Sequence, residues 1–145
     1  MARFFYPYGN AAELSGKSYT VEGGTNGTQP TFTGDPMFYG EYTRVGNLVH
    51  FEITVDFDNI TNFGTGQYYL TLPFDTSKTS TFSNGTLSDD SSGKFYHVYG
   101  VALEGQNQIQ LWYDSPNGQG EPFEHNSPVT LGVADFFTIA GTYNV

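Results

Sequence analysis

The sequence contains no cysteine, which excludes disulfide bonds, thiol catalysis and thiolate metal sites. It is also poor in charge, since Asp, Glu, Lys and Arg make up only 14% of its 145 residues. Five of these residues are basic and fifteen are acidic, which gives a net charge of −10. Because an acidic surface repels nucleic acid and anionic membranes, we expect neither as a partner.

Long hydrophobic runs are missing as well. No stretch reaches the length that a membrane-spanning helix requires, so we expect no membrane insertion. The start of the chain lacks the apolar core of a signal peptide, because residues 1–3 are followed by aromatic residues and Pro7. We therefore expect synthesis in a cytoplasm, whatever the final location of the protein.

The chain is rich in aromatic residues, at 17% of the sequence, and in glycine, at 18 residues. Aromatic side chains are favoured in β-strands, and glycines mark the turns between them. This composition indicates an all-β protein with large interaction surfaces, although an ordinary sandwich rich in Tyr and Phe has the same composition. A chain of this length forms one domain that folds without a metal or a disulfide.

Residues 36–57 carry the clearest structural pattern. Apolar and polar side chains alternate strictly in the second half, which predicts a half-buried β-strand. The apolar set is Val49, Phe51, Ile53, Val55 and Phe57, and the polar set is His50, Glu52, Thr54 and Asp56. We expect the apolar set to face the core of the domain.

Gly46 and Asn47 connect this strand to the preceding one. Glycine accepts the positive φ that the first central position of a type II′ hairpin turn requires. A two-residue turn sets Glu41 beside Glu52 on the polar face. The register on the apolar face then pairs Tyr42 with Phe51, Gly40 with Ile53 and Phe38 with Val55.

Further segments have the alternation or composition of short strands, and no segment has a convincing helical pattern. They are residues 18–22, 67–72, 78–87, 95–103, 108–113, 129–133 and 136–145. In residues 95–103 the alternating set is Phe95, His97, Tyr99, Val101 and Leu103, so we interpret His97 as a hydrogen-bonded core or seam residue. About eight strands in residues 36–145 predict an all-β, jelly-roll-like antiparallel β-sandwich.

Residues 1–35 differ from this pattern, and we expect an extended N-terminal arm followed by a flexible spacer. The glycine-rich residues 23–28 predict the spacer. The arm has four aromatic residues in five positions: Phe4, Phe5, Tyr6 and Tyr8. Exposed, they would be an aggregation hazard, so we interpret them as an attachment segment. Such a segment packs on its own domain, on a neighbouring subunit or on a larger assembly.

Catalytic chemistry has little support in the sequence. There is no GxSxG nucleophile motif, and only three histidines occur. Glu121, Glu124 and His125 lie in a proline-rich loop, which is a poor support for acid–base groups. The acidic residues 56–58 and 89–90 could supply oxygen ligands for calcium, but they lack EF-hand spacing and Asp-rich turns form for backbone reasons alone. We expect no enzymatic activity and no cofactor.

A second set of aromatic side chains falls opposite the main apolar faces of the expected strands. These residues are Tyr39, Tyr69, Tyr96 and Trp112. One small sandwich cannot bury them together with its main core, so they are candidates for a subunit interface. Glycan stacking is the alternative, because planar aromatic rings stack on sugar faces.

Three stretches carry a resemblance to a known family: GEYTRVGNLVHFEITVDFDN, GQYYLTLPF and the closing IAGTYNV. Together they resemble the small jelly-roll domain of tailed-phage virion proteins, which ends tail fibres and also occurs in head decoration or fibre proteins. The resemblance covers residues 36–145 and implies a non-enzymatic homotrimer. No functional residue of the family transfers to this chain, because the binding loops of such domains vary.

From this resemblance we expect a virion structural protein that decorates or cements the capsid surface. Its N-terminal arm would bind the major capsid protein or another virion protein, because too little chain precedes residue 36 for a long fibre shaft. The alternative is the receptor-binding tip or adhesin domain of a tail or head fibre, which would bind a host surface glycan.

Overall fold

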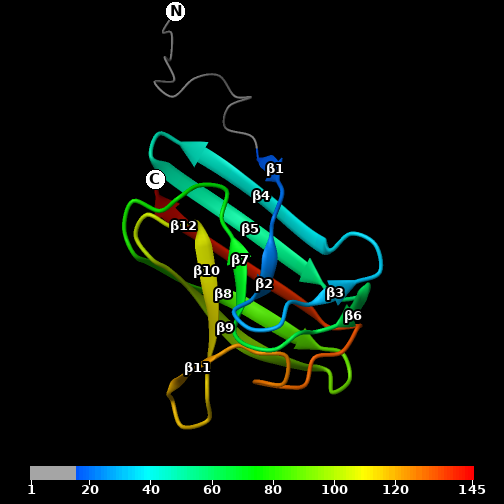
Figure 1. Cartoon of the computed structure of the whole chain (residues 1–145). Helices are drawn as coiled ribbons and strands as arrows, with labels where there is room; N and C mark the ends of the chain where they lie inside the picture. The colour runs from blue at the N-terminus through cyan, green and yellow to red at the C-terminus, as the bar shows by residue number, and fades with distance from the viewer. Residues whose placement is uncertain (1–15) are drawn as a thin grey trace, which may run out of the picture.

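Strands make up most of the computed structural model, which describes residues 16–145 (Figure 1). No helix occurs in this part of the chain. The strands are β1 (Lys17–Tyr19), β2 (Gly23–Thr25), β3 (Thr31–Phe32), β4 (Met37–Val45), β5 (Leu48–Asp56), β6 (Ile60–Asn62), β7 (Tyr68–Thr71), β8 (Ser80–Asp89), β9 (Lys94–Ala102), β10 (Gln108–Asp114), β11 (Gly120–Pro122) and β12 (Phe136–Asn144). The expected attachment residues Phe4, Phe5, Tyr6 and Tyr8 lie outside the described residues.

Ten strands form one antiparallel sheet in the order β1-β4-β5-β12-β8-β9-β10-β7-β2, with β11 paired to β10. Strands β3 and β6 form a separate two-stranded sheet. Strands β8, β9 and β10 follow one another as hairpins and β7 lies beside β10, which is a Greek-key arrangement. The all-β antiparallel β-sandwich expected from the sequence is confirmed, and its layers come from one continuous curled sheet (Figure 1).

The two edges of the curled sheet are joined by a short piece of chain. Strand β1 pairs with β4 at one edge, and β2, only three residues later, pairs with β7 at the other edge. The Tyr19 hydroxyl donates a hydrogen bond of 3.0 Å to the carbonyl of Thr71. The Glu22 amide donates to Thr71 Oγ1 at 2.8 Å, and the Thr71 amide donates to the Glu22 carbonyl at 2.9 Å. These bonds close the sandwich across the core.

The hairpin of β4 and β5 has the register that the sequence predicts. Phe51 lies opposite Tyr42 and Ile53 lies opposite Gly40, while Glu41 lies opposite Glu52 on the exposed face. The turn is the two residues 46–47, and Gly46 has a φ of +60°. Since no non-glycine residue of the described chain has a positive φ, the turn has the one positive φ of type II′ rather than the two of type I′.

The core is dominated by aromatic side chains that meet edge to face. The Phe51 ring centroid lies 4.9 Å from that of Phe82 and 6.0 Å from that of Tyr143. The apolar faces expected for residues 67–72, 108–113 and 136–145 all point into this core. Phe123, which follows β11 in the long loop, is also buried and stacks near Phe137 with ring centroids 5.8 Å apart.

Strand β9 faces the opposite way from the sequence expectation. Its core-facing residues include Val98, Gly100 and Ala102, whereas Phe95, His97, Tyr99, Val101 and Leu103 lie on the outer side. The inner positions must be small because large side chains already fill the space. A Cβ on Gly100 would come within 2.2 Å of Ile109 Cγ2. The core alternative for His97 is therefore wrong, since its side chain is about half exposed. The expected hydrogen bond is present, because His97 Nε2 lies 2.6 Å from the Ser83 carbonyl oxygen.

Residues 129–133 form no strand, contrary to the sequence expectation. The Asp135 carboxylate holds this segment in a turn by accepting a hydrogen bond of 2.7 Å from the Gly132 amide. The Leu131 amide donates to the carbonyl of His125 at 2.8 Å. Of this segment only Leu131 is fully buried, so it anchors a loop instead of continuing an alternating pattern.

The structure places residues 17–32 inside the sandwich rather than in a flexible spacer before residue 36. They form β1, β2 and β3, and Val21 and Thr25 are buried. The glycines of this segment allow close packing. A Cβ on Gly23 would lie 2.7 Å from the Phe38 ring, and one on Gly27 would lie 2.4 Å from the carbonyl oxygen of Thr65. Close backbone approach thus explains the composition that suggested flexibility.

Candidate functional site

The four aromatic residues expected to face outward are divided among three places. Tyr39 on β4 is 57% exposed and lies beside Thr54 of β5. Tyr69 on β7 and Trp112 on β10 share the outer face near the other edge of the sheet, because their strand neighbours point into the core. Tyr96 on β9 packs against the core. The structure therefore brings only Tyr69 and Trp112 onto one surface.

Uncharged side chains cover the outer face of β12, β8 and β9 at one end of these strands. Phe136, Ser88 and Phe95 lie opposite one another in a row across the three strands, and the outward-facing Asp56 of β5 continues this row beside Phe136. Phe136 is 43% exposed and Phe95 is 71% exposed. The neighbouring row on β5, β12 and β8 consists of Thr54, Thr138 and Thr86. We call the surface of these six uncharged residues the threonine–phenylalanine face.

The threonine–phenylalanine face has the character of a contact surface. Neighbouring strands lie about 4.8 Å apart, so the backbone positions of Phe95 and Phe136, which are two strands apart, are separated by about 10 Å. Both side chains can therefore touch one partner. Exposed apolar groups of this kind mark interaction sites when they gather on one surface. The sequence expectation misses both residues, although Phe136 directly precedes Phe137 and one of two adjacent strand residues must face outward.

A second surface lies near the other edge of the sheet, where Tyr69 lines two hollows. The larger hollow has a volume of about 570 Å³ and is bounded by Glu22, Asp35, Phe38 and the chain between β1 and β2. The smaller hollow has a volume of about 200 Å³. Tyr69 lines both, and no Lys or Arg lines either. The smaller hollow is lined by four amide side chains: Asn26, Gln67, Gln108 and Gln110.

Strand β2 holds the Tyr69 ring in place. A Cβ on Gly24 would lie only 2.9 Å from the Tyr69 hydroxyl and 2.3 Å from Gln29 Oε1, so the tyrosine and the glutamine close over the glycine. The Gln29 amide is itself fixed by Thr25. Its Oε1 accepts from the Thr25 amide at 3.1 Å, and its Nε2 donates to the Thr25 carbonyl at 2.6 Å. The Tyr69 ring thus rests on an ordered strand.

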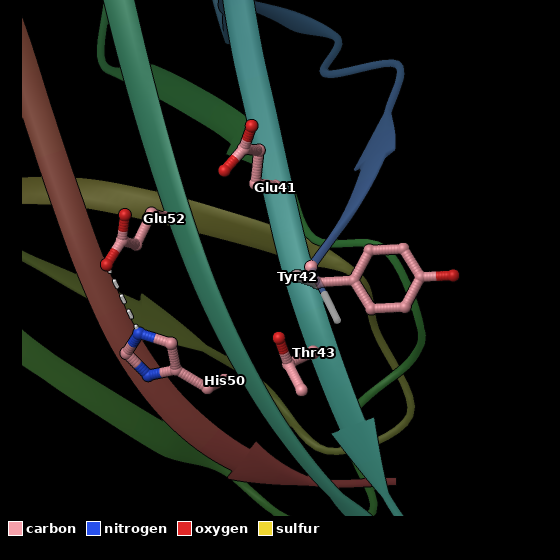
Figure 2. A pocket seen from close by; sticks show the side chains of 6 residues that line it. Glu41, Tyr42, Thr43, His50 and Glu52 are labelled. Atoms are coloured by element: carbon pink, nitrogen blue, oxygen red, sulfur yellow. Dashed lines mark hydrogen bonds and ion pairs between the residues drawn. The ribbon is translucent and has the colours of Figure 1, made fainter. Parts of the chain in front are cut away.

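A small pocket on the outer face of β4 and β5 brings two carboxylates near a histidine (Figure 2). His50 Nε2 lies 3.5 Å from Glu52 Oε1, and His50 Nδ1 lies 3.2 Å from Thr142 Oγ1. Figure 2 shows Glu41 reaching into the same space from β4, whereas Tyr42 points away. The histidine and Glu52 are more than half exposed, so their ion pair contributes at most about 1 kcal/mol. The contact is an ion pair only when His50 is protonated, so a neutral His50 does not offset the repulsion between the glutamates.

The loop of residues 115–128 does not assemble an acid–base pair. Glu121 lies on β11, where its Oε2 accepts a hydrogen bond of 3.1 Å from the Tyr113 hydroxyl. The same hydroxyl lies 2.6 Å from Ser127 Oγ. His125 Nδ1 has no hydrogen-bond partner among the described residues, so neither Glu121 nor Glu124 orients it. The side chains of this loop hold the loop against β10.

In the acidic turn of residues 89–90, the Asp89 carboxylate is occupied by hydrogen bonds within the turn. Asp89 is buried and accepts hydrogen bonds from the Ser91 amide, the Ser91 hydroxyl and the Ser92 hydroxyl. These bonds from Ser91 and Ser92 hold the pKa of Asp89 below its ordinary value. The Asp90 amide in turn donates to the Asp135 carboxylate at 2.9 Å. Within residues 16–145, no three metal-ligating side chains gather in a metal site.

No family model matches the chain, and no curated protein or solved structure matches it significantly. No helix in residues 16–145 has the length and apolar character needed to cross a membrane. The fold is an antiparallel β-sandwich with two separate candidate surfaces: the uncharged threonine–phenylalanine face, and the hollows beside Tyr69, which carry two carboxylates but no Lys or Arg.

Proposed function

We propose that the protein is a non-enzymatic structural component of a phage particle, a homotrimer that decorates or cements the capsid surface. The threonine–phenylalanine face carries this proposal. Identical chains with a net charge of −10 repel one another, so they associate best through an uncharged contact. The exposed rings of Phe95 and Phe136 supply apolar area at such a contact.

The virion location is supported by the sequence resemblance to phage jelly-roll domains. The stretches that carry it form β4, β5, β7 and part of β12, which build the core. These stretches therefore support an architecture shared with the phage domains, and they say nothing about a shared ligand. The proposed partner is the major capsid protein or another virion protein, and the proposed contact is the aromatic segment Phe4, Phe5, Tyr6 and Tyr8.

The association is tested by light scattering on the purified protein. Three copies of the 16.0 kDa chain give a mass of about 48 kDa for the trimer. Phe136→Glu places a charge in the threonine–phenylalanine face and should produce a monomer of 16.0 kDa. Gln106→Glu adds the same charge at an exposed position in the β9–β10 turn and should leave the trimer intact.

Two results would contradict the proposal. One is a stable wild-type monomer at micromolar concentration. The other is a Phe136→Glu variant that keeps the mass of the wild type. Circular dichroism on both variants separates loss of association from loss of folding, and Phe136 is exposed enough for the folded chain to tolerate a charge there.

A further inference from the structure

We propose that the two hollows beside Tyr69 form one binding site for an uncharged oligosaccharide, here called the Tyr69 site. Its walls come from β2, β7, β10 and the segments that flank β1 and β4. The site lies away from the threonine–phenylalanine face, which is on β5, β12, β8 and β9. Binding at this site therefore does not depend on the proposed assembly.

The amide side chains of the smaller hollow select a ligand rich in hydroxyl groups. Gln67 and Asn26 already make hydrogen bonds within the chain. Gln67 Nε2 donates to the Leu111 carbonyl, and Asn26 Oδ1 accepts from the backbone N–H of Gln67. Gln108 and Gln110 are exposed, and their side chains make no hydrogen bond within the described part of the chain. Each free amide offers a donor and an acceptor, which matches the hydroxyls of a sugar.

The Tyr69 ring, which lines both hollows, supplies an aromatic face on which a sugar ring can stack. A sugar ring presents C–H groups on one face, and an aromatic side chain with a polar tip contacts such a face and its hydroxyls together. Because the Tyr69 ring already packs against Gly24 of β2, little side-chain entropy is lost when a ligand binds.

The charge around the site excludes acidic sugars. Glu22 and Asp35 are exposed at the larger hollow, and neither hollow has a Lys or Arg to pair with a ligand carboxylate or sulfate. The two carboxylates accept hydrogen bonds from neutral hydroxyl groups instead. Since Tyr69 lines two hollows, the ligand is an oligosaccharide of at least two units rather than a monosaccharide.

The test is a glycan array that carries neutral, sialylated and uronic-acid-containing oligosaccharides, followed by calorimetric titration of the best neutral binder. We expect binding to be confined to neutral glycans. Tyr69→Ala should weaken binding at least about tenfold, as removal of a central aromatic anchor does. Gln110→Ala should weaken it about threefold to tenfold through the loss of hydrogen bonds.

Tyr39→Ala is the matched control, because it removes an exposed tyrosine from β4, outside both hollows. It should leave the affinity unchanged, and Tyr69→Phe should keep more affinity than Tyr69→Ala. The proposal is overturned if no neutral glycan binds or if acidic glycans bind best. Equal losses from Tyr39→Ala and Tyr69→Ala would also overturn it. Light scattering of the same variants reports separately on the association.

Discussion

At the scale of single residues, the aromatic cluster around Phe51 packs the neighbouring strands β5, β12 and β8 against one another on the core side. Phe51 is 0% exposed and contacts Phe82 and Tyr143 edge to face. Phe51→Ala should lower the free energy of unfolding by about 3–5 kcal/mol, because the cavity adds to the lost burial. Urea unfolding measures this change. Leu48→Ala, on the same strand but 47% exposed, should change it by less than about 0.5 kcal/mol. Similar losses in both variants would contradict the burial of Phe51.

Tyr143, which belongs to the same cluster, makes the stability of the fold depend on pH in the alkaline range. Its hydroxyl donates to the Phe74 carbonyl at 3.0 Å, and burial raises its pKa from 10.0 to about 12. Below pH 10 the residue is neutral in both states and its stabilisation is fully present. Between pH 10 and about 12 the unfolded chain releases the proton first, so stability falls as pH rises.

The Tyr143→Phe variant isolates this contribution. Phenylalanine does not ionise, so the free energy of unfolding should fall less steeply from pH 10 to 12 than in the wild type. Burial also raises the pKa of Tyr19 and Tyr68, and these two residues should keep part of the slope in the variant. Urea unfolding at several pH values in that range gives the two slopes. Identical slopes for the wild type and the variant would show that Tyr143 does not cause the loss of stability at alkaline pH.

At the scale of elements, strand β9 depends on a glycine that faces large side chains. A Cβ on Gly100 would meet Ile109 Cγ2 at 2.2 Å and Ile139 Cδ1 at 3.1 Å. Gly100→Ala should therefore destabilise the fold by about 1–3 kcal/mol through overpacking. Gly132→Ala is the control, since its nearest contact is an ordinary 3.8 Å, and it should be neutral or stabilising by up to about 1 kcal/mol. Thermal unfolding that ranks the two variants the other way would contradict this packing.

The elements that could be predicted from the sequence are those in which one face is apolar over a whole strand. Strand β5 is such a case, and its single buried face together with Gly46 fixed the register with β4. The sequence pattern assigns strand β9 to the wrong face, because its outer side has larger apolar residues than its inner side. The positions of Ile109 on the next strand and of Ile139 on β12 explain the choice of Gly100.

Less of the candidate surfaces than of the fold could be predicted from the sequence. Tyr69 and Trp112 could be assigned to the outer face because both strands alternate clearly. The hollows beside Tyr69 could not be foreseen, since they depend on β2 crossing to the far edge of the sheet. Glycine-rich residues 23–28 predict flexibility in isolation, and the close contact of Gly24 with Tyr69 appears only in the folded chain.

At the scale of the whole molecule, the chain that closes the sandwich begins at β1. The pairing of β1 with β4 starts at Lys17, so the sandwich requires residues well upstream of residue 36. A truncation that starts the protein at residue 36 would remove β1, β2 and β3 and expose the β4 and β7 edges. A test of the proposed attachment segment must therefore stop before Lys17.

Deletion of residues 1–8 meets this requirement and tests attachment directly. It removes Phe4, Phe5, Tyr6 and Tyr8 but none of the strand pairs of the sandwich. We expect a melting temperature close to that of the wild type and loss of co-sedimentation with phage capsids that lack the protein. A full-length variant with these four aromatics replaced by serine controls for chain length and should behave in the same way. If the segment instead fills the core of its own domain, the melting temperature should fall by about 8 °C or more. That fall, with capsid binding retained, would overturn the attachment proposal, because burial within the domain would then explain why four aromatic residues lie so close together.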